Sequence, residues 1–223
     1  AHLTKYDSTH GPFGFSVAVE EDHLLVDNDR IAILSQRNPA DLPWGDLDVD
    51  VALECTGIFV SKEDASMHLD AGAKRVLISA PASGVDLTVV YGVNDDKMAA
   101  DNTVISNASC TTNCIAPVIK VVHEQFGIAH GAILTVHDVT NTQSVLDQYH
   151  KDLRRARASA MSLIPTSTGS ATAIAEIFPE LRGKLNGMAV RVPLANASVT
   201  DCGFELETSA NAAEVNAALE RAA

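Results

Sequence analysis

The sequence predicts an α/β fold in two halves, on two observations. First, an apolar strand pattern (residues 49–57), a helix pattern (residues 61–73) and a second apolar strand pattern (residues 74–81) follow one another with short connections, which is typical of a parallel βαβ unit. Second, from Gly131 onward the strand patterns are longer and alternate with polar residues, which indicates an antiparallel sheet with a helical face. The 223 residues suffice for one large domain or two modest ones.

The first half contains short strands, one helix and clear turn signals. Alternating apolar runs in residues 15–34 are interrupted by the sequence "DND", which predicts a hairpin turn. Ser61 is the expected N-cap of the helix that follows, and Gly72 its end. The stretches "LTVVYGVN" (residues 87–94) and "TVISNAS" (residues 103–109) continue the series of strands.

A long helix is predicted to begin at Cys110 and to end at Gly127. It carries apolar residues at helical spacing, namely Ile115, Val118, Ile119, Val122 and Phe126. Strands are then expected over residues 131–139 and within 185–207, with a helix in residues 168–181 between them and another from Asn211. The change of pattern near Ser109 is the best candidate for a boundary between domains 1–109 and 110–223.

Composition narrows the functional classes. Lys and Arg number 16 against 29 Asp and Glu, a net charge of -13 that disfavours binding to nucleic acid and anionic membranes. No apolar run is long enough to cross a bilayer, and no leader precedes the first strand, so we expect a soluble, cytoplasmic protein. Four cysteines at this chain length favour free thiols over a disulfide framework.

The stretch "SNASCTTNC" (residues 106–114) is the strongest candidate for chemistry. Cys110 lies at the start of a predicted helix, where unpaired N–H groups and the helix dipole favour a thiolate and can hold an oxyanion. A buried structural turn is the alternative reading. Cys114 lies one helical turn later and is expected only to pack. A metal site is disfavoured, because neither the cysteines nor the histidines show paired ligand spacing.

A thiolate mechanism also needs a base and, for an anionic substrate, local positive charge. His137 is placed at the end of a predicted strand, where it serves either as a base or as a structural side chain. Four basic residues fall within "KDLRRAR" (residues 151–157), which is either an anion site or a solvated turn.

Several motifs in register resemble the glyceraldehyde-3-phosphate dehydrogenases across essentially the whole chain. They include "KYDSTHG", "RNPADLPW", "ECTGIF", "HLDAGAKRVLISAP", "SNASCTTNC", "VHDVTNTQ", "HKDLRRARASAMSLIPTSTGSATAI" and "GKLNGMAVRVP". This resemblance implies a partial Rossmann-type NAD-binding domain in residues 1–109 and an α+β catalytic domain in residues 110–223. It also implies a cytoplasmic homotetramer that acts in glycolysis.

The resemblance assigns the chemistry residue by residue. Cys110 would attack the aldehyde to give a thiohemiacetal and then a thioester, and His137 would activate the thiol. Inorganic phosphate would release the acyl group as 1,3-bisphosphoglycerate. The substrate phosphate would be bound by Thr140, Thr142 and Arg191, and the attacking phosphate by Ser109, Thr111, Arg155, Thr168 and Gly169. Contacts to NAD are implied near Arg37, Thr56, Gly57 and Ser79, and NADP is not excluded.

Three features qualify the resemblance. The family's glycine-rich dinucleotide fingerprint would precede Ala1 and its final helix would follow Ala223, so the chain reads as an excerpt. Asp138 stands where many members have a small residue, and its carboxylate either affects His137 or points away. Residues 191–207 resemble the arsenate-resistance branch, which makes 1-arseno-3-phosphoglycerate. Erythrose-4-phosphate dehydrogenase, an inactive fragment or interaction protein, and a Cys–His hydrolase stay open as alternatives.

Overall fold

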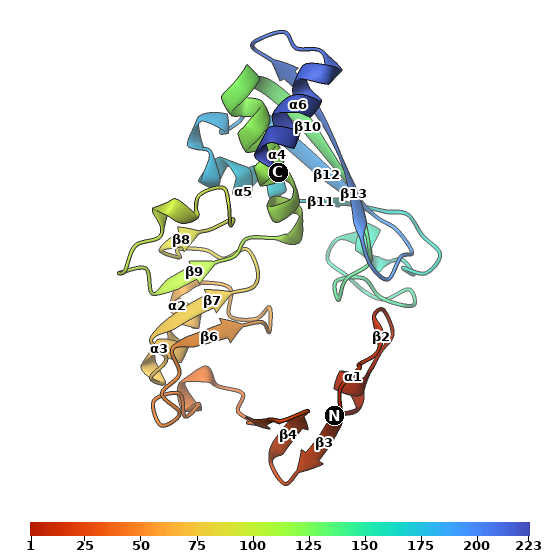
Figure 1. Cartoon of the computed structure of the whole chain (residues 1–223). Helices are drawn as coiled ribbons and strands as arrows, with labels where there is room; N and C mark the ends of the chain where they lie inside the picture. The colour runs from red at the N-terminus through yellow and green to blue at the C-terminus, as the bar shows by residue number, and fades with distance from the viewer.

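The first segment of the chain forms an exposed arm. A computed structural model describes residues 1–170 and 172–223 in full, together with the backbone of residue 171. The arm, residues 1–38, contains α1 (His2–Lys5), β1 (Tyr6–Asp7), β2 (Gly11–Pro12), β3 (Val17–Glu20), β4 (His23–Val26) and β5 (Asp29–Ala32). The turn between β4 and β5 confirms the predicted hairpin. In Figure 1 β3 and β4 of the arm lie at the bottom of the view, below the parallel sheet, and the part with α1 and β2 turns upward at the right.

The second part is a four-stranded parallel sheet in the order β6-β7-β9-β8. Its strands are β6 (Val51–Glu54), β7 (Arg75–Ile78), β8 (Leu87–Thr88) and β9 (Val104–Ser106). The short helix η1 (Pro39–Asp41) precedes β6, and η2 (Asp95–Lys97) lies between β8 and β9. β6 and β7 pair in parallel across α2 (Lys62–Ala65) and α3 (Met67–Asp70), so the predicted βαβ unit is confirmed.

Two predictions in this part need correction in detail. The single helix expected from Ser61 to Gly72 is two short helices that meet at Ser66, whose hydroxyl bonds back to the Lys62 carbonyl, an interaction that bends helices. The strand expected over residues 87–94 ends at Thr88. Its continuation is a turn, because the Asn94 side chain accepts from Val90 N–H and donates to the Thr88 carbonyl.

Helix α4 (Cys110–Phe126) links the parallel sheet to the second sheet and has the predicted bounds. Ser109 caps its first turn, with Oγ accepting from the Thr112 N–H at 3.0 Å. Gly127, with φ of 69° and ψ of 142°, ends the helix in a conformation that residues with a Cβ rarely adopt. The buried side chains of α4 include Ile115, Ile119 and Val122.

The second sheet has the strand order β11-β12-β10-β13. Its strands and the remaining helices are β10 (Ile128–His137), η3 (Leu153–Ala156), β11 (Ile164–Ser167), α5 (Ser170–Ile177), η4 (Pro179–Leu181), β12 (Leu185–Arg191), β13 (Ser198–Leu206) and α6 (Ala212–Ala222). The sheet is mixed rather than antiparallel throughout, because β10 and β12 pair in parallel. Residues 138–184, which include α5, supply the long crossover that parallel pairing requires.

The main core lies between this sheet and its helices. Helix α4 packs against β10 and β13 and is flanked by α5 and α6, which Figure 1 shows on one side of the sheet. Fully buried Ile119, Ile128 and Ile174 come from α4, β10 and α5. Among the residues that the structure describes, every helix is too short or too polar to cross a lipid bilayer.

Candidate active site

Cys110 is presented by a tight turn between β9 and α4. The turn has three residues, and its middle residue, Ala108, is buried with a φ of 57°. This left-handed conformation costs roughly 1 kcal/mol in a residue with a Cβ. The Ala108 N–H donates to Ser106 Oγ at 3.0 Å and so holds the turn. Cys110 therefore becomes the first residue of α4 and is exposed, beside N–H groups that have no partner within the helix.

His137 ends β10 and faces this cysteine. Its side chain is buried, and Nε2 lies 3.4 Å from Cys110 Sγ. The structure thus brings together the two residues predicted to carry the chemistry, although 27 positions separate them in the chain. A thiol and an imidazole at this distance can exchange a proton directly.

The other ring nitrogen of His137 has three close neighbours. Nδ1 lies 2.5 Å from Asp138 Oδ1 and 2.9 Å from the Asp138 carbonyl oxygen. Arg191 Nη1 lies 2.6 Å from the same nitrogen and donates to the Asp138 carbonyl at 3.0 Å. The placement of Arg191 follows from the sheet, because His137 and Arg191 are paired at the ends of parallel strands β10 and β12.

A cavity of about 240 Å³ opens beside the Cys110–His137 pair. Six further residues predicted for the site line it: Ser109, Thr111, Arg155, Thr168, Gly169 and Arg191. Two helix N-termini, of α4 and α5, meet there with two guanidinium groups. Hydroxyls, helix N-termini and guanidiniums are the groups that bind phosphate oxygens. The cavity is therefore built for an anion.

Arg191 shows the electrostatic character of this cavity most directly. Its Nε is buried and has no hydrogen-bond partner among the described residues. Burial lowers the pKa of the Arg191 guanidinium, and repulsion from Arg155 lowers it further, while Cys110 and Asp138 act in the opposite direction. An anion bound between the two guanidiniums would remove that repulsion and give Nε an acceptor.

Thr140 and Thr142, also predicted for the site, do not line this cavity. They lie next to it, since Arg155 Nη1 donates to Thr142 Oγ1 at 2.9 Å and the two threonine hydroxyls are 3.0 Å apart. Arg155 therefore connects two groups of residues that the resemblance assigned to separate phosphates. The residues predicted for the two anion sites are therefore in direct contact through Arg155 and Thr142.

Sequence reasoning missed several lining residues, among them Pro81, Ser167 and Ser170. Ser170 is the first residue of α5, and its hydroxyl lies 2.7 Å from Thr168 Oγ1. The sequence "TGS" before a helical pattern is a signal that could have identified this helix start as part of the site.

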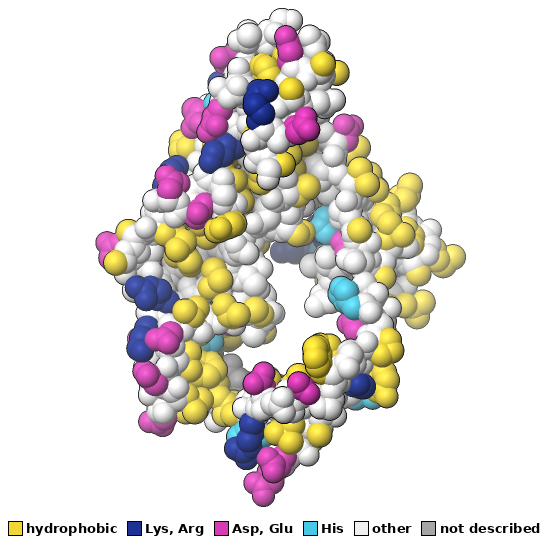
Figure 2. Space-filling model, viewed as in Figure 1, with side chains coloured by type: hydrophobic (Ala, Val, Ile, Leu, Met, Phe, Trp, Pro, Cys, Tyr) yellow, Lys and Arg dark blue, Asp and Glu magenta, His cyan; other side chains and the backbone are white. Residues whose placement is uncertain are grey.

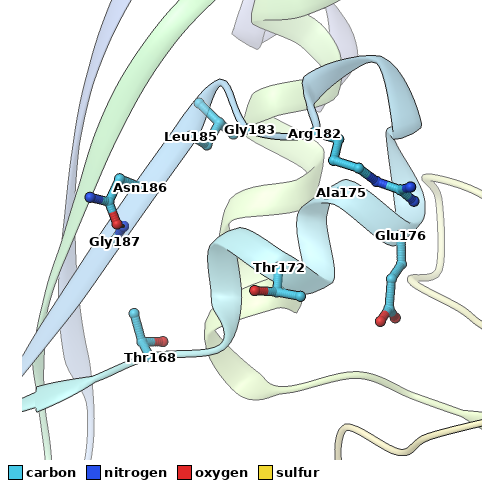
Figure 3. Close-up of a pocket in the computed structure, with 9 residues that line it drawn as sticks. All are labelled: Thr168, Thr172, Ala175, Glu176, Arg182, Gly183, Leu185, Asn186 and Gly187. Atoms are coloured by element: carbon cyan, nitrogen blue, oxygen red, sulfur yellow. Dashed lines mark hydrogen bonds between the residues drawn. The ribbon is translucent and has the colours of Figure 1, made fainter.

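Two other cavities frame the site. One, of about 290 Å³, lies against Cys110 and His137 and is also lined by Cys114, Asp138 and Ser198, so the Cys110 thiol borders two spaces. The larger one, of about 440 Å³, lies along α5 and the start of β12 and contains neither Cys110 nor His137 (Figure 3). We assign the chemistry to the cavity of about 240 Å³ because the nucleophile, the base and both guanidiniums line it.

The predicted cofactor residues lie mainly at one edge of the parallel sheet. Thr56 and Gly57 follow β6, and Ser79 follows β7, so all three are at the carboxyl ends of adjacent parallel strands and are exposed. Arg37 is exposed in the segment between β5 and η1. Ligands of open parallel sheets bind at the carboxyl edge, which suits Thr56, Gly57 and Ser79.

A buried carboxylate fixes the loop that contains Thr56. Glu54 accepts from the Thr56 N–H at 2.7 Å and from its hydroxyl, and His68 Nε2 lies 3.0 Å away. Burial alone would raise the pKa of Glu54, but the hydrogen bonds from Thr56 and His68 outweigh it and lower this pKa. Trp44 Nε1 donates to His68 Nδ1, so the imidazole carries its proton on Nε2 and donates to Glu54.

The described residues show neither a metal cluster nor a disulfide. No three His, Cys, Asp or Glu side chains among them gather as metal ligands. All four cysteines are free, with Cys110 and Cys114 exposed.

Comparison with known proteins shows to which family the chain belongs. Residues 1–62 match "Glyceraldehyde 3-phosphate dehydrogenase, NAD binding domain", and residues 109–223 match the corresponding "C-terminal domain". The whole chain is 55% identical to the plasmid-encoded glyceraldehyde-3-phosphate dehydrogenase of Cupriavidus necator and 56% identical to that of Geobacillus stearothermophilus, and it spans 67% of each. With the enzyme of Streptomyces coelicolor the identity is 54%. The chain therefore belongs to the glyceraldehyde-3-phosphate dehydrogenase family, a family of NAD-dependent oxidoreductases.

Proposed function

We propose that this protein oxidises glyceraldehyde 3-phosphate to 1,3-bisphosphoglycerate, with NAD as oxidant and inorganic phosphate as co-substrate. One observation carries the proposal: Cys110 Sγ lies 3.4 Å from His137 Nε2 at the wall of an anion cavity that holds Arg155 and Arg191. A nucleophile, a base and two cationic side chains in one place are what acyl transfer to phosphate requires.

The first chemical step belongs to the Cys110–His137 pair. His137 Nε2 takes the thiol proton, and Sγ attacks the aldehyde carbon to form a thiohemiacetal. The N–H groups at the start of α4 and the protonated imidazole stabilise the developing oxyanion. The imidazolium then gives its proton to this oxygen, and the neutral His137 takes it back as the hydride leaves and the carbonyl re-forms. This order of events uses each group at the position in which the fold holds it.

The residues at the carboxyl edge of the parallel sheet fit the cofactor. Thr56, Gly57 and Ser79 offer exposed hydroxyls and an open glycine there, and Arg37 is assigned a contact by the family pattern. Such groups suit the polar part of a dinucleotide. When bound, NAD supplies the hydride acceptor, so that the acyl group is left on Cys110 as a thioester.

The anion cavity serves the second half of the reaction. Ser109, Thr111, Thr168, Gly169 and Arg155 would hold the attacking phosphate next to the thioester, and Arg191 with Thr140 and Thr142 would hold the phosphate of the substrate. The hydrogen bond between Arg155 and Thr142 makes the two groups neighbours. The site would therefore bind both anions close together, which lowers the entropic cost of the attack.

The requirement for an attacking anion tests the reaction class. In the complete protein, NAD reduction should depend on added phosphate, and arsenate should substitute for it because the two anions are nearly the same size. Sustained turnover that is equally fast with neither anion present would contradict the phosphorylating reaction. Erythrose 4-phosphate as the aldehyde tests the alternative substrate in the same assay.

The role of Cys110 is tested against Cys114, the matched thiol one helical turn away. We expect Cys110→Ser to lower kcat by about 10³-fold or more, because an alcohol in this position lacks an adequate nucleophile. Cys114→Ser should leave kcat within about twofold, as expected for a side chain outside the chemistry. Both variants should bind NAD like the parent. Equal losses of kcat in the two variants would overturn the assignment.

We also propose a cytoplasmic homotetramer. The loop of residues 138–163 exposes Leu146, Tyr149 and Met161, which are between 75% and 90% accessible, and hydrophobic side chains gather at the right of Figure 2, where this loop lies. Such a patch supports burial against another copy, and the free thiols support a reducing compartment. Sedimentation analysis of the complete protein should give four times the chain mass. A monomer at micromolar concentration would contradict this proposal.

A further inference from the structure

The side chain of Asp138 has no role in the reaction described above. Its carboxylate lies 2.5 Å from His137 Nδ1, on the side of the ring that faces away from Cys110. The side chains of both residues are largely buried, with 8% of His137 and 20% of Asp138 exposed. Water therefore screens this contact less than it would screen a surface ion pair.

The neighbours of Nδ1 favour one position of the imidazole proton. If Nδ1 were unprotonated, its lone pair could accept from Arg191 Nη1 at 2.6 Å, but it would also face the Asp138 carboxylate at 2.5 Å, which is repulsive. If Nδ1 carries the proton, it donates to Asp138, and Arg191 donates instead to the Asp138 carbonyl at 3.0 Å. The second arrangement gives both the Nδ1 proton and Arg191 Nη1 an acceptor and sets no lone pair against the carboxylate, so we place the proton on Nδ1.

This assignment determines what the other ring nitrogen can do. With the proton on Nδ1, Nε2 presents a lone pair to Cys110 Sγ at 3.4 Å and can accept the thiol proton. The imidazolium that forms would lie beside the positive charge of Arg191, whose Nη1 is 2.6 Å from the ring. The carboxylate of Asp138 offsets that charge, which the neutral backbone carbonyl cannot do to the same extent.

We propose that Asp138 is a positioning residue that holds the Nδ1 proton of His137 and stabilises the imidazolium, so that Cys110 is kept ready to react. The inference rests on the proposed role of Cys110 and extends it by one residue. Cys110, His137 and Asp138 then form a chain in which the proton of Sγ moves to Nε2 while the Nδ1 proton stays shared with the carboxylate.

The test measures the thiol directly, without cofactor or aldehyde. Iodoacetamide alkylates Cys110 as the thiolate displaces iodide and forms a thioether, and mass spectrometry separates Cys110 from Cys114. We expect Asp138→Asn and Asp138→Ser to slow alkylation of Cys110 by about 10-fold, the usual scale for losing a partner that orients a reactive histidine. Asp96→Asn, a loss of the same charge in the exposed helix η2, should react at the wild-type rate.

Each outcome decides one claim. If Asp138→Asn and Asp138→Ser, checked for folding by circular dichroism, react as fast as wild type, the positioning role is overturned. If wild-type Cys110 reacts no faster than Cys114, the proposed nucleophile itself fails, and with it this inference. Nitrogen NMR of the wild-type His137 ring needs no variant at all: a proton on Nε2 rather than Nδ1 in the neutral ring would also overturn the proposal.

Kinetics of the complete protein separate positioning from a general loss of structure. Asp138→Asn should lower kcat about 10-fold and leave KM for the aldehyde and for NAD within about twofold, because the carboxylate acts through His137 and lies outside the anion cavity. A change confined to KM would contradict the inference.

Discussion

The arm of residues 1–38 and the region around α4 and β10 contain similar apolar patterns but bury them differently. In the arm, Val19 and Ile31 are 65% and 45% exposed, and none of the residues 1–38, all of which the structure describes, is buried. In the other region, Ile119 and Ile133 are at most 2% exposed. Alternation of apolar residues is thus enough to indicate a strand or hairpin, whereas burial depends on a second layer of structure that packs against it.

The largest effect expected from this comparison concerns equal substitutions in the two regions. Ile119→Ala should reduce the free energy of unfolding by about 3 kcal/mol, because it leaves a cavity between α4 and the sheet. Ile31→Ala removes the same atoms from an exposed strand and should change the free energy of unfolding by less than about 0.5 kcal/mol. Urea denaturation of both variants checks the difference. Similar losses would show that the arm is packed in solution.

A smaller effect on the free energy of unfolding is expected from the loss of one of two carboxylates, Asp86 beside the parallel sheet or Asp7 in the arm. A hydrogen bond from Lys62 and the N–H groups of Val104 and Thr103 lower the pKa of Asp86 to about 2. A carboxylate whose pKa is lowered by folding stabilises the folded state at every pH above its ordinary pKa. This contribution to the free energy of unfolding is lost as pH falls from about 4 to about 2. Asp86→Asn should therefore lower the free energy of unfolding by about 1 kcal/mol at pH 7 and leave it unchanged near pH 2. The figure at pH 7 is reduced to allow for solvent screening, because Lys62 is 43% exposed.

The matched carboxylate in the arm is Asp7. The N–H groups of His10 and Thr9 lower the pKa of Asp7, but the group is fully exposed. We expect Asp7→Asn to have a smaller effect on unfolding at pH 7 than Asp86→Asn. Denaturation curves of the two variants between pH 2 and pH 7 make the comparison, and a larger loss for Asp7→Asn would contradict it.

The sequence predicts local structure well where a single residue type controls it. Ser109 and Gly127 define the two ends of α4 because a hydroxyl cap and a glycine with positive φ act on their immediate neighbours. The shortened strand β8 was missed because Asn94 redirects the backbone from six residues away. The parallel pairing of β10 and β12 was missed for a related reason, since it depends on a crossover of 47 residues and not on either strand alone.

In the candidate site, too, the sequence predicted individual residues better than contacts between distant segments. Residue type and position indicated Cys110 and His137, and the family resemblance indicated the polar residues of the anion cavity. The contact between Arg155 and Thr142, and the meeting of Asp138 and Arg191 at one ring nitrogen, depend on side-chain directions at strand ends and in a loop. Side-chain directions of this kind are set by packing between distant segments, which a single sequence does not display.

The pairing of His137 with Arg191 across β10 and β12 has a consequence for divergence within the family. Backbone hydrogen bonds between the two strands set the separation of imidazole and guanidinium. The length of the intervening segment, residues 138–184, therefore does not determine this separation. The residues of the anion cavity within this segment, such as Arg155 and Thr168, still have to be placed by the fold of the segment. A slip of one residue in β12 would instead turn Arg191 to the opposite face of the sheet, so changes of length should be rejected in the strand and tolerated only in those parts of the segment that carry no site residue.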